Sequence, residues 1–90
     1  MTPFALRIVT PGGLAYDGPA EEIVVRTVSG DLGVLAGHIP CVAPLGKGPC
    51  TILSGGQRRY AACTGGLLRV AREGVTLICA SFAWTENVKR

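Results

Sequence analysis

The sequence predicts an all-β fold: a flattened sandwich or barrel of about nine or ten short strands, mostly antiparallel. Hydrophobic residues make up 48% of the 90 residues, which is enough to form a core. The 13 glycines and 6 prolines are many for this length and suit a chain with frequent turns. Hydrophobic residues alternate with period two in short runs, and no helical period is present. The length fits a single domain that spans residues 1–90.

Four strands are expected in the first part of the chain. The first places Phe4, Leu6 and Ile8 on one face, as a strand with one buried side does. The third is rich in β-branched residues, which favour strands. The expected strands and the turns between them follow in this order: residues 4–10, Pro11-Gly12-Gly13, residues 14–17, Gly18-Pro19, residues 21–28, Ser29-Gly30-Asp31 and residues 32–35.

Five or six strands are expected in the second part, after a loop that ends at Pro40. The segment Ser54-Gly55-Gly56-Gln57 has the composition of a hairpin turn. Residues 81–90 form either a last strand or the start of something longer. The expected strands and their breaks are residues 41–45, the turn 46–49, residues 50–53, the hairpin turn, residues 58–64, the bend Gly65-Gly66, residues 67–71, the turn 72–74 and residues 75–80.

Charge and hydropathy exclude several classes of partner. The formal net charge is +3, and the nine basic residues are scattered without an aromatic and basic stripe, so no nucleic-acid partner is expected. No apolar run approaches the roughly 20 residues of a membrane span, so direct membrane insertion is not expected. The first six residues do not resemble a signal peptide. These features predict a protein of the cell or organelle interior, either free or docked on a membrane complex.

Four cysteines, Cys41, Cys50, Cys63 and Cys79, are widely spaced and include no C-x-x-C pair. With a single histidine in the chain, a zinc site would need at least three of these thiolates from separate segments. Disulfides are also disfavoured without a secretion signal. We therefore expect reduced, mostly buried thiols, with no bound metal and no cofactor.

Residues suited to catalysis are few. His38 is the only histidine, and Cys41 lies three residues away, so a Cys-His pair stays open, although a loop histidine that caps backbone groups is the simpler interpretation. Gly46-Lys47-Gly48 lacks the rest of a phosphate-binding loop. Glu21 and Glu22 are adjacent on a strand and point to opposite faces, so they cannot act as an acid and base pair. The sequence thus indicates a binding or structural module without a small-molecule substrate.

Residues 29–40 read SGDLGVLAGHIP. This segment resembles the signature of the ATP synthase epsilon-subunit family, called delta in mitochondria: an acidic-Leu-Gly turn, an aliphatic strand, and Gly-His-x-Pro. Ala36 stands where the family often has Pro, and Ile39 where it has Ala or Thr. Residues 65–70, GGLLRV, resemble the Gly-Gly-x-x-x-Val segment of the same family, and the resemblance covers about residues 4–85.

The resemblance implies a non-catalytic rotor subunit that joins the gamma subunit to the membrane c-ring, peripheral on the cytoplasmic face of the bacterial plasma membrane. It places Asp31 at the ring as an interface charge, with an exposed turn acid as the alternative. Trp84 is either an interface anchor or a core residue. The resemblance assigns the ring interface to Ser29, Gly30, Asp31, Gly37 and His38, and a structural role in the loops to Gly33, Pro40, Gly65 and Gly66.

The family usually continues past the sandwich into a C-terminal helical hairpin, which acts as a brake. The printed sequence ends at Arg90 without it, so the 90-residue chain is expected to couple the two sectors but not to inhibit hydrolysis. Two other functions remain open. One is a free-standing β-sandwich that binds a peptide or a small ligand; the other is a small enzyme that uses Cys41 and His38.

Overall fold

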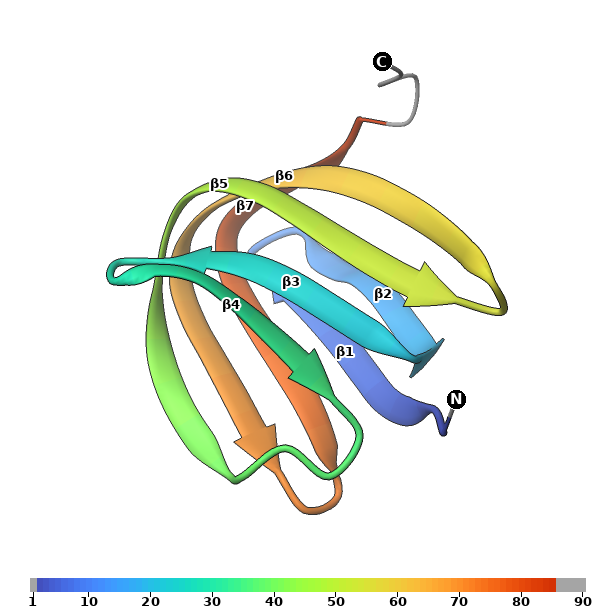
Figure 1. Cartoon of the computed structure of the whole chain (residues 1–90). Coiled ribbons are helices and arrows are strands. Elements are labelled where there is room, and N and C mark those ends of the chain that lie inside the picture. The colour runs from blue at the N-terminus through green and yellow to red at the C-terminus, as the bar shows by residue number, and fades with distance from the viewer. Residues whose placement is uncertain (1, 86–90) are drawn as a thin grey trace.

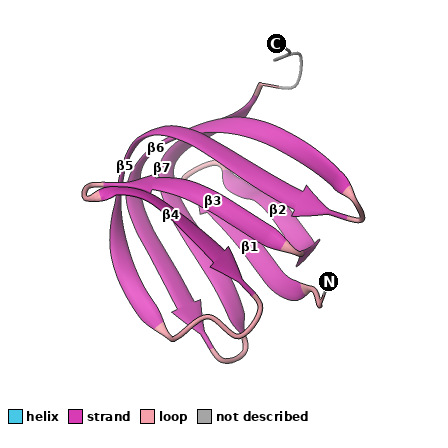
Figure 2. Ribbon diagram, viewed as in Figure 1, coloured by secondary structure: helices cyan, strands magenta, loops and turns pink. Residues whose placement is uncertain are grey.

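The structure, a computed structural model, describes residues 2–85 and contains seven β-strands joined by short turns (Figure 1). Every regular element among these residues is a strand, which confirms the all-β class (Figure 2). No helix that could cross a membrane is found in this part of the chain. The strands are β1 (Phe4–Thr10), β2 (Gly13–Ala20), β3 (Glu22–Thr27), β4 (Gly30–Leu35), β5 (Cys41–Ser54), β6 (Gln57–Ala71) and β7 (Gly74–Trp84).

The strands form one sheet in the order β2-β1-β7-β6-β5-β3-β4. Neighbours are antiparallel except β1 and β7, which run parallel from the pair Leu6–Val75 to the pair Val9–Ile78, so the mostly antiparallel pairing is confirmed. The sheet folds over on itself, and the long strands β5 and β6 curve around the molecule (Figure 1). This folding produces the two layers of a flattened sandwich.

The two layers share the three long strands. In the first layer, β2 and β1 lie beside the first half of β7, the second half of β6 and the first half of β5. In the second layer, β4 and β3 lie beside the second half of β5, the first half of β6 and the end of β7. The long strands therefore carry the chain from one layer to the other, as strands do at the corners of orthogonal sheet packings.

The structure has seven strands rather than the expected nine or ten, because three pairs of expected strands are each continuous. Expected segments 41–45 and 50–53 form β5, and segments 58–64 and 67–71 form β6. Segment 75–80 and the first part of segment 81–90 form β7. The end of the last expected segment, residues 86–90, lies outside the described residues. The second expected strand also continues through Gly18-Pro19, which an edge strand such as β2 tolerates.

In β5 and β6, the glycines between the paired segments bend the strand without ending it. The pairing of β5 with β6 keeps the same register on both sides of the bend, from Pro44–Leu67 to Gly48–Cys63. The alternation of buried positions on β5, however, shifts by one residue at the bend: inward positions are odd-numbered up to Leu45 and even-numbered from Cys50. This shift keeps the inner side of the strand facing the core after it has turned into the other layer.

The core lies between the two layers and is built from the inward positions of all seven strands. Each fully buried Leu or Ile contributes roughly 1.5–3 kcal/mol relative to an exposed one. The hairpin turn between β5 and β6 is confirmed, with positive φ at Gly55 and Gly56 as a type I′ turn requires. The largest fully buried side chains are Leu6, Ile8, Ile23, Ile52, Leu68, Leu77, Val25, Val34 and Cys50.

Candidate interaction surfaces

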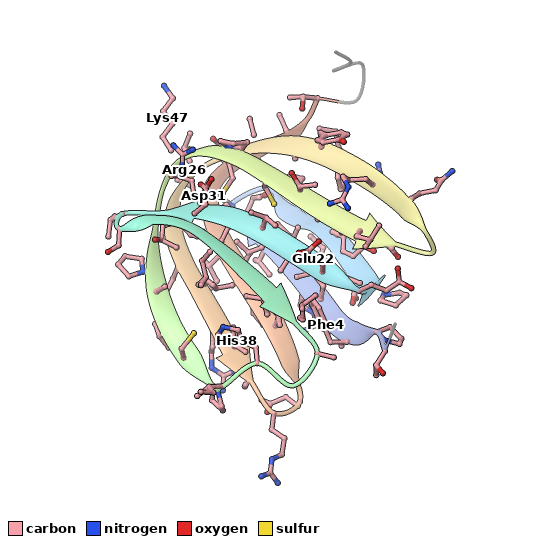
Figure 3. The ribbon with its side chains drawn as sticks, viewed as in Figure 1. Phe4, Glu22, Arg26, Asp31, His38 and Lys47 are labelled. Atoms are coloured by element: carbon pink, nitrogen blue, oxygen red, sulfur yellow. The ribbon has the colours of Figure 1, made fainter. Side chains whose placement is uncertain are left out.

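The residues assigned to the ring interface lie at two opposite ends of β4. Ser29 belongs to the turn between β3 and β4, and Asp31 to the start of β4, whereas Gly37 and His38 belong to the loop after β4. The strand between them has six residues, a span of about 20 Å. Figure 3 shows Asp31 and His38 well apart along β4. The structure therefore does not bring these residues together on one surface.

Asp31 is held by an ion pair on its own hairpin. Its Oδ1 atom accepts a hydrogen bond from Arg26 Nε at 2.5 Å, and the two residues pair directly across β3 and β4. This hydrogen bond raises the pKa of Arg26 above its usual value. Gly48 leaves room for the arginine, since a Cβ at Gly48 would lie 2.8 Å from Arg26 Cβ. Because the side chain of Asp31 is 57% exposed, its carboxylate can still contact a partner.

Thr27 fixes the turn that presents Ser29, a role that sequence reasoning missed. Its hydroxyl donates to the Gly30 carbonyl at 2.7 Å and accepts from the Ser29 N–H at 3.1 Å. Thr27 is 8% exposed, so these bonds are largely shielded from water. A threonine two residues before Ser-Gly, at the end of a β-branched run, is the sequence signal that could have revealed it.

We expect Thr27→Val to lower the free energy of unfolding by about 1–2 kcal/mol, because a group of the same shape removes two shielded hydrogen bonds. Thr10 supplies a matched control, since its hydroxyl makes the same two contacts, with Gly13 O at 3.1 Å and Gly12 N at 3.2 Å, in an exposed turn. Thr10→Val should cost clearly less. Urea unfolding of both variants measures the difference, and equal costs would argue against a special role for Thr27.

His38 contacts backbone groups, in line with the simpler of the two interpretations. Its Nδ1 lies 2.7 Å from the Ile39 carbonyl oxygen, so Nδ1 carries a proton and donates. Its backbone N–H donates to Leu35 O at 3.1 Å. The Nδ1 atom of His38 is therefore engaged by a carbonyl of its own loop and not by Cys41. A hollow of about 340 Å³ lies beside this loop and is lined in part by Phe4.

Trp84 lies at the rim of the core and is half-buried. Its ring meets Phe82 edge-on at 5.0 Å and Tyr16 at 6.2 Å between centroids. The guanidinium of Arg59 sits 3.8 Å from the centre of the same ring. Of the two expected roles, these contacts support packing at the open end of the sandwich, between β2 and the end of β7.

An apolar row crosses the outer side of the first layer. Successive residues of the row are direct partners in neighbouring strands: Pro44 with Leu67, Leu67 with Ile78, Ile78 with Val9, and Val9 with Leu14. Direct partners lie about 5 Å apart, so the row is continuous over five strands. Leu14 is 57% exposed, Ile78 48% and Leu67 36%.

One further exposed side chain extends this row. Val42 lies on the same side of β5 as Pro44 and is 60% exposed. Sequence reasoning missed this surface, although apolar residues at positions that alternate with the buried ones were a visible signal. We call it the apolar face: Val9, Leu14, Val42, Pro44, Leu67 and Ile78.

Comparison with known proteins identifies the family. Residues 3–85 match the family described as "ATP synthase, Delta/Epsilon chain, beta-sandwich domain". The chain is 41% identical over 90 residues to the ATP synthase epsilon chain of Bacillus velezensis, covering all of this chain and 68% of that protein. It is 37% identical over 90 residues to the epsilon chain of Caldicellulosiruptor saccharolyticus, again over its full length and 66% of the relative. The chain thus spans about two thirds of the length of these relatives.

Solved structures show the same fold. A chain of the Euglena gracilis mitochondrial ATP synthase, in a structure of OSCP, F1 and c-ring, superposes with a TM-score of 0.87 at 25% identity, covering 99% of this chain and 57% of that one. A chain of the central stalk and c-ring structure of the Tetrahymena thermophila mitochondrial ATP synthase reaches 0.74 at 16% identity, over 90% of this chain and 66% of the other. The protein therefore belongs to the ATP synthase delta/epsilon family and comprises its β-sandwich domain, a non-catalytic accessory part of that complex.

Proposed function

We propose that this chain is a rotor subunit of the central stalk, which joins the gamma subunit to the c-ring and couples ion translocation to ATP synthesis or hydrolysis. The observation that carries the proposal is the apolar face. Single exposed apolar residues are common on soluble proteins, but a continuous row over five strands is typical of a surface that a partner covers. We assign this face to the gamma subunit.

The c-ring contact belongs to the end of the sandwich that carries the turn between β3 and β4. The ion pair of Arg26 and Asp31 and the exposed Lys47 lie at this end, as Figure 3 shows. Charged and polar groups of this kind suit contact with the polar loops of a membrane ring. Gly37 and His38 lie at the other end of β4 and are therefore not part of this contact. The chain then sits peripherally at the cytoplasmic face of a bacterial membrane, as the bacterial relatives suggest.

Co-purification with the cognate gamma subunit tests the proposal. The 90-residue chain, mixed with purified gamma, should co-elute as a one-to-one complex in size-exclusion chromatography. A folded chain that does not bind gamma, but does bind a peptide or small molecule at the hollow beside Phe4 and His38, would favour the free-standing binding module instead.

We expect Asp31→Lys to weaken attachment to the membrane sector by at least about tenfold, because it reverses a charge at the proposed ring contact. Folding should change by less than about 1 kcal/mol, since the ion pair with Arg26 is exposed. Glu22→Lys is a control outside both proposed contacts, because Glu22 pairs with Arg58, at 3.6 Å, at the start of β3 in the second layer. Binding to membranes stripped of the catalytic sector, in the presence of gamma, measures the effect. Normal binding by Asp31→Lys would make Asp31 a solvated turn residue.

A further inference from the structure

Two thiols in the core stand almost at bonding distance. Cys63 on β6 and Cys79 on β7 are 5% and 2% exposed, and their Sγ atoms are 2.9 Å apart and share a hydrogen bond. The sulfur atoms of a disulfide are about 2.05 Å apart. A movement of less than about 1 Å would therefore bring this pair to bonding distance.

The bend between the two layers creates this proximity. Cys63 precedes the bend of β6 at Gly65 and Gly66, and Gly66 pairs with Cys79 on β7. Both cysteines point inward, one from each layer, so their side chains converge on the concave side of the fold. The strands are joined beside them by pairing on both sides of the bend, which holds the two thiols together.

We propose that Cys63 and Cys79 form an oxidation site at which hydrogen peroxide converts two thiols into a reversible intramolecular disulfide. The Cys63 thiolate attacks one peroxide oxygen, which breaks the O–O bond and leaves a sulfenic acid and hydroxide. Cys79 then attacks the Cys63 sulfur and expels the second hydroxide. The two thiol protons neutralise the hydroxides, so that two thiols and one peroxide give one disulfide and two waters.

The surroundings assign the roles of the thiols. A hydrogen bond from Cys79 stabilises the thiolate of Cys63, which lowers the pKa of Cys63 and raises that of Cys79. Burial raises the pKa of the nearby Cys50 to about 12, which keeps this third thiol protonated and unreactive. No group of three possible metal ligands is found within residues 2–85, which favours a dithiol over a metal site. Hydrogen peroxide is small and neutral, so it reaches the buried pair through local opening fluctuations of the fold.

Thiol mapping of the 90-residue chain tests the proposal. Trypsin places the four cysteines in separate peptides, with Cys63 in residues 60–69 and Cys79 in residues 73–89. After treatment of the folded protein with hydrogen peroxide and alkylation, two of the four thiols should be lost. One cross-linked pair, 60–69 with 73–89, should appear and should vanish after reduction with dithiothreitol. The melting temperature should rise by at least about 5 °C on oxidation and fall back on reduction.

Variants separate this pair from the other thiols. Cys50→Ala and Cys41→Ala should form the same cross-link, whereas Cys63→Ala and Cys79→Ala should not. The mapping of the unmodified protein needs no variant, so a folding defect in any of them leaves the test intact. A cross-link through Cys41 or Cys50, sulfinic acid at Cys63 without a cross-link, or four intact thiols under conditions that oxidise free cysteine would each overturn the proposal.

Discussion

Gly66→Ala is expected to lower the free energy of unfolding by at least about 4 kcal/mol, a large part of the stability of a domain of this size. A Cβ at this position would lie 1.8 Å from the Ile78 carbonyl oxygen and 2.8 Å from its carbonyl carbon. Both atoms belong to the backbone of β7, which pairs with β6 on either side of Gly66 and cannot move aside without breaking that pairing. Urea or thermal unfolding measures the loss.

A control for backbone strain is available in the same chain. Gly66 has φ of 114°, which an L-residue adopts at a cost of roughly 1–3 kcal/mol even without a clash. Gly13 has φ of 124°, but a Cβ there would meet nothing within 4 Å. Gly13→Ala therefore measures the strain alone, and the excess cost of Gly66→Ala measures the close approach of β6 and β7. Equal costs would mean that the bend can open to admit a side chain.

The same bend explains why the sequence predicted the fold class but too many strands. Period-two alternation depends only on local side-chain direction, so it located nearly every stretch of strand correctly. Glycine pairs, however, look alike whether they end a strand or bend it. Gly55 and Gly56 form a hairpin turn, whereas Gly65 and Gly66 lie inside β6. Gly65 and Gly66 bend β6 without ending it because β7 pairs with β6 on both sides of them. This partner is distant in the chain, so the local sequence around the two glycines does not reveal it.

The candidate surfaces were predictable to a different degree. Turn residues marked the expected turn Ser29-Gly30-Asp31 and the loop of His38, although the structure places the turn at Val28 and Ser29 and begins β4 at Gly30. Their separation by the length of β4 was not predicted, since residues close in a motif can lie at opposite ends of a strand. The apolar face was missed because its members, such as Leu14 and Ile78, come from five strands and only the sheet order makes them neighbours.

Ile78→Glu is expected to weaken binding to the gamma subunit by about 100-fold, or about 2.7 kcal/mol. Ile78 lies in the middle strand of the apolar face, so a partner that covers this face would bury an unpaired carboxylate there. Its side chain is 48% exposed and points away from the core, so the variant should fold with a change within about 1 kcal/mol. Isothermal titration against purified gamma measures the affinity, and circular dichroism checks the fold.

Tyr60→Glu distinguishes a loss of contact from a general effect of added charge. Tyr60 is 38% exposed on β6, in the half that belongs to the second layer and pairs with Thr51 of β5. It therefore lies outside the apolar face, and its replacement should leave gamma binding within about twofold, since a charge outside the contact adds little. If both variants bind gamma equally poorly, the loss reflects charge and not the surface. If Ile78→Glu binds as the unmodified chain does, gamma does not cover the apolar face, and the contact must lie on another side of the sandwich.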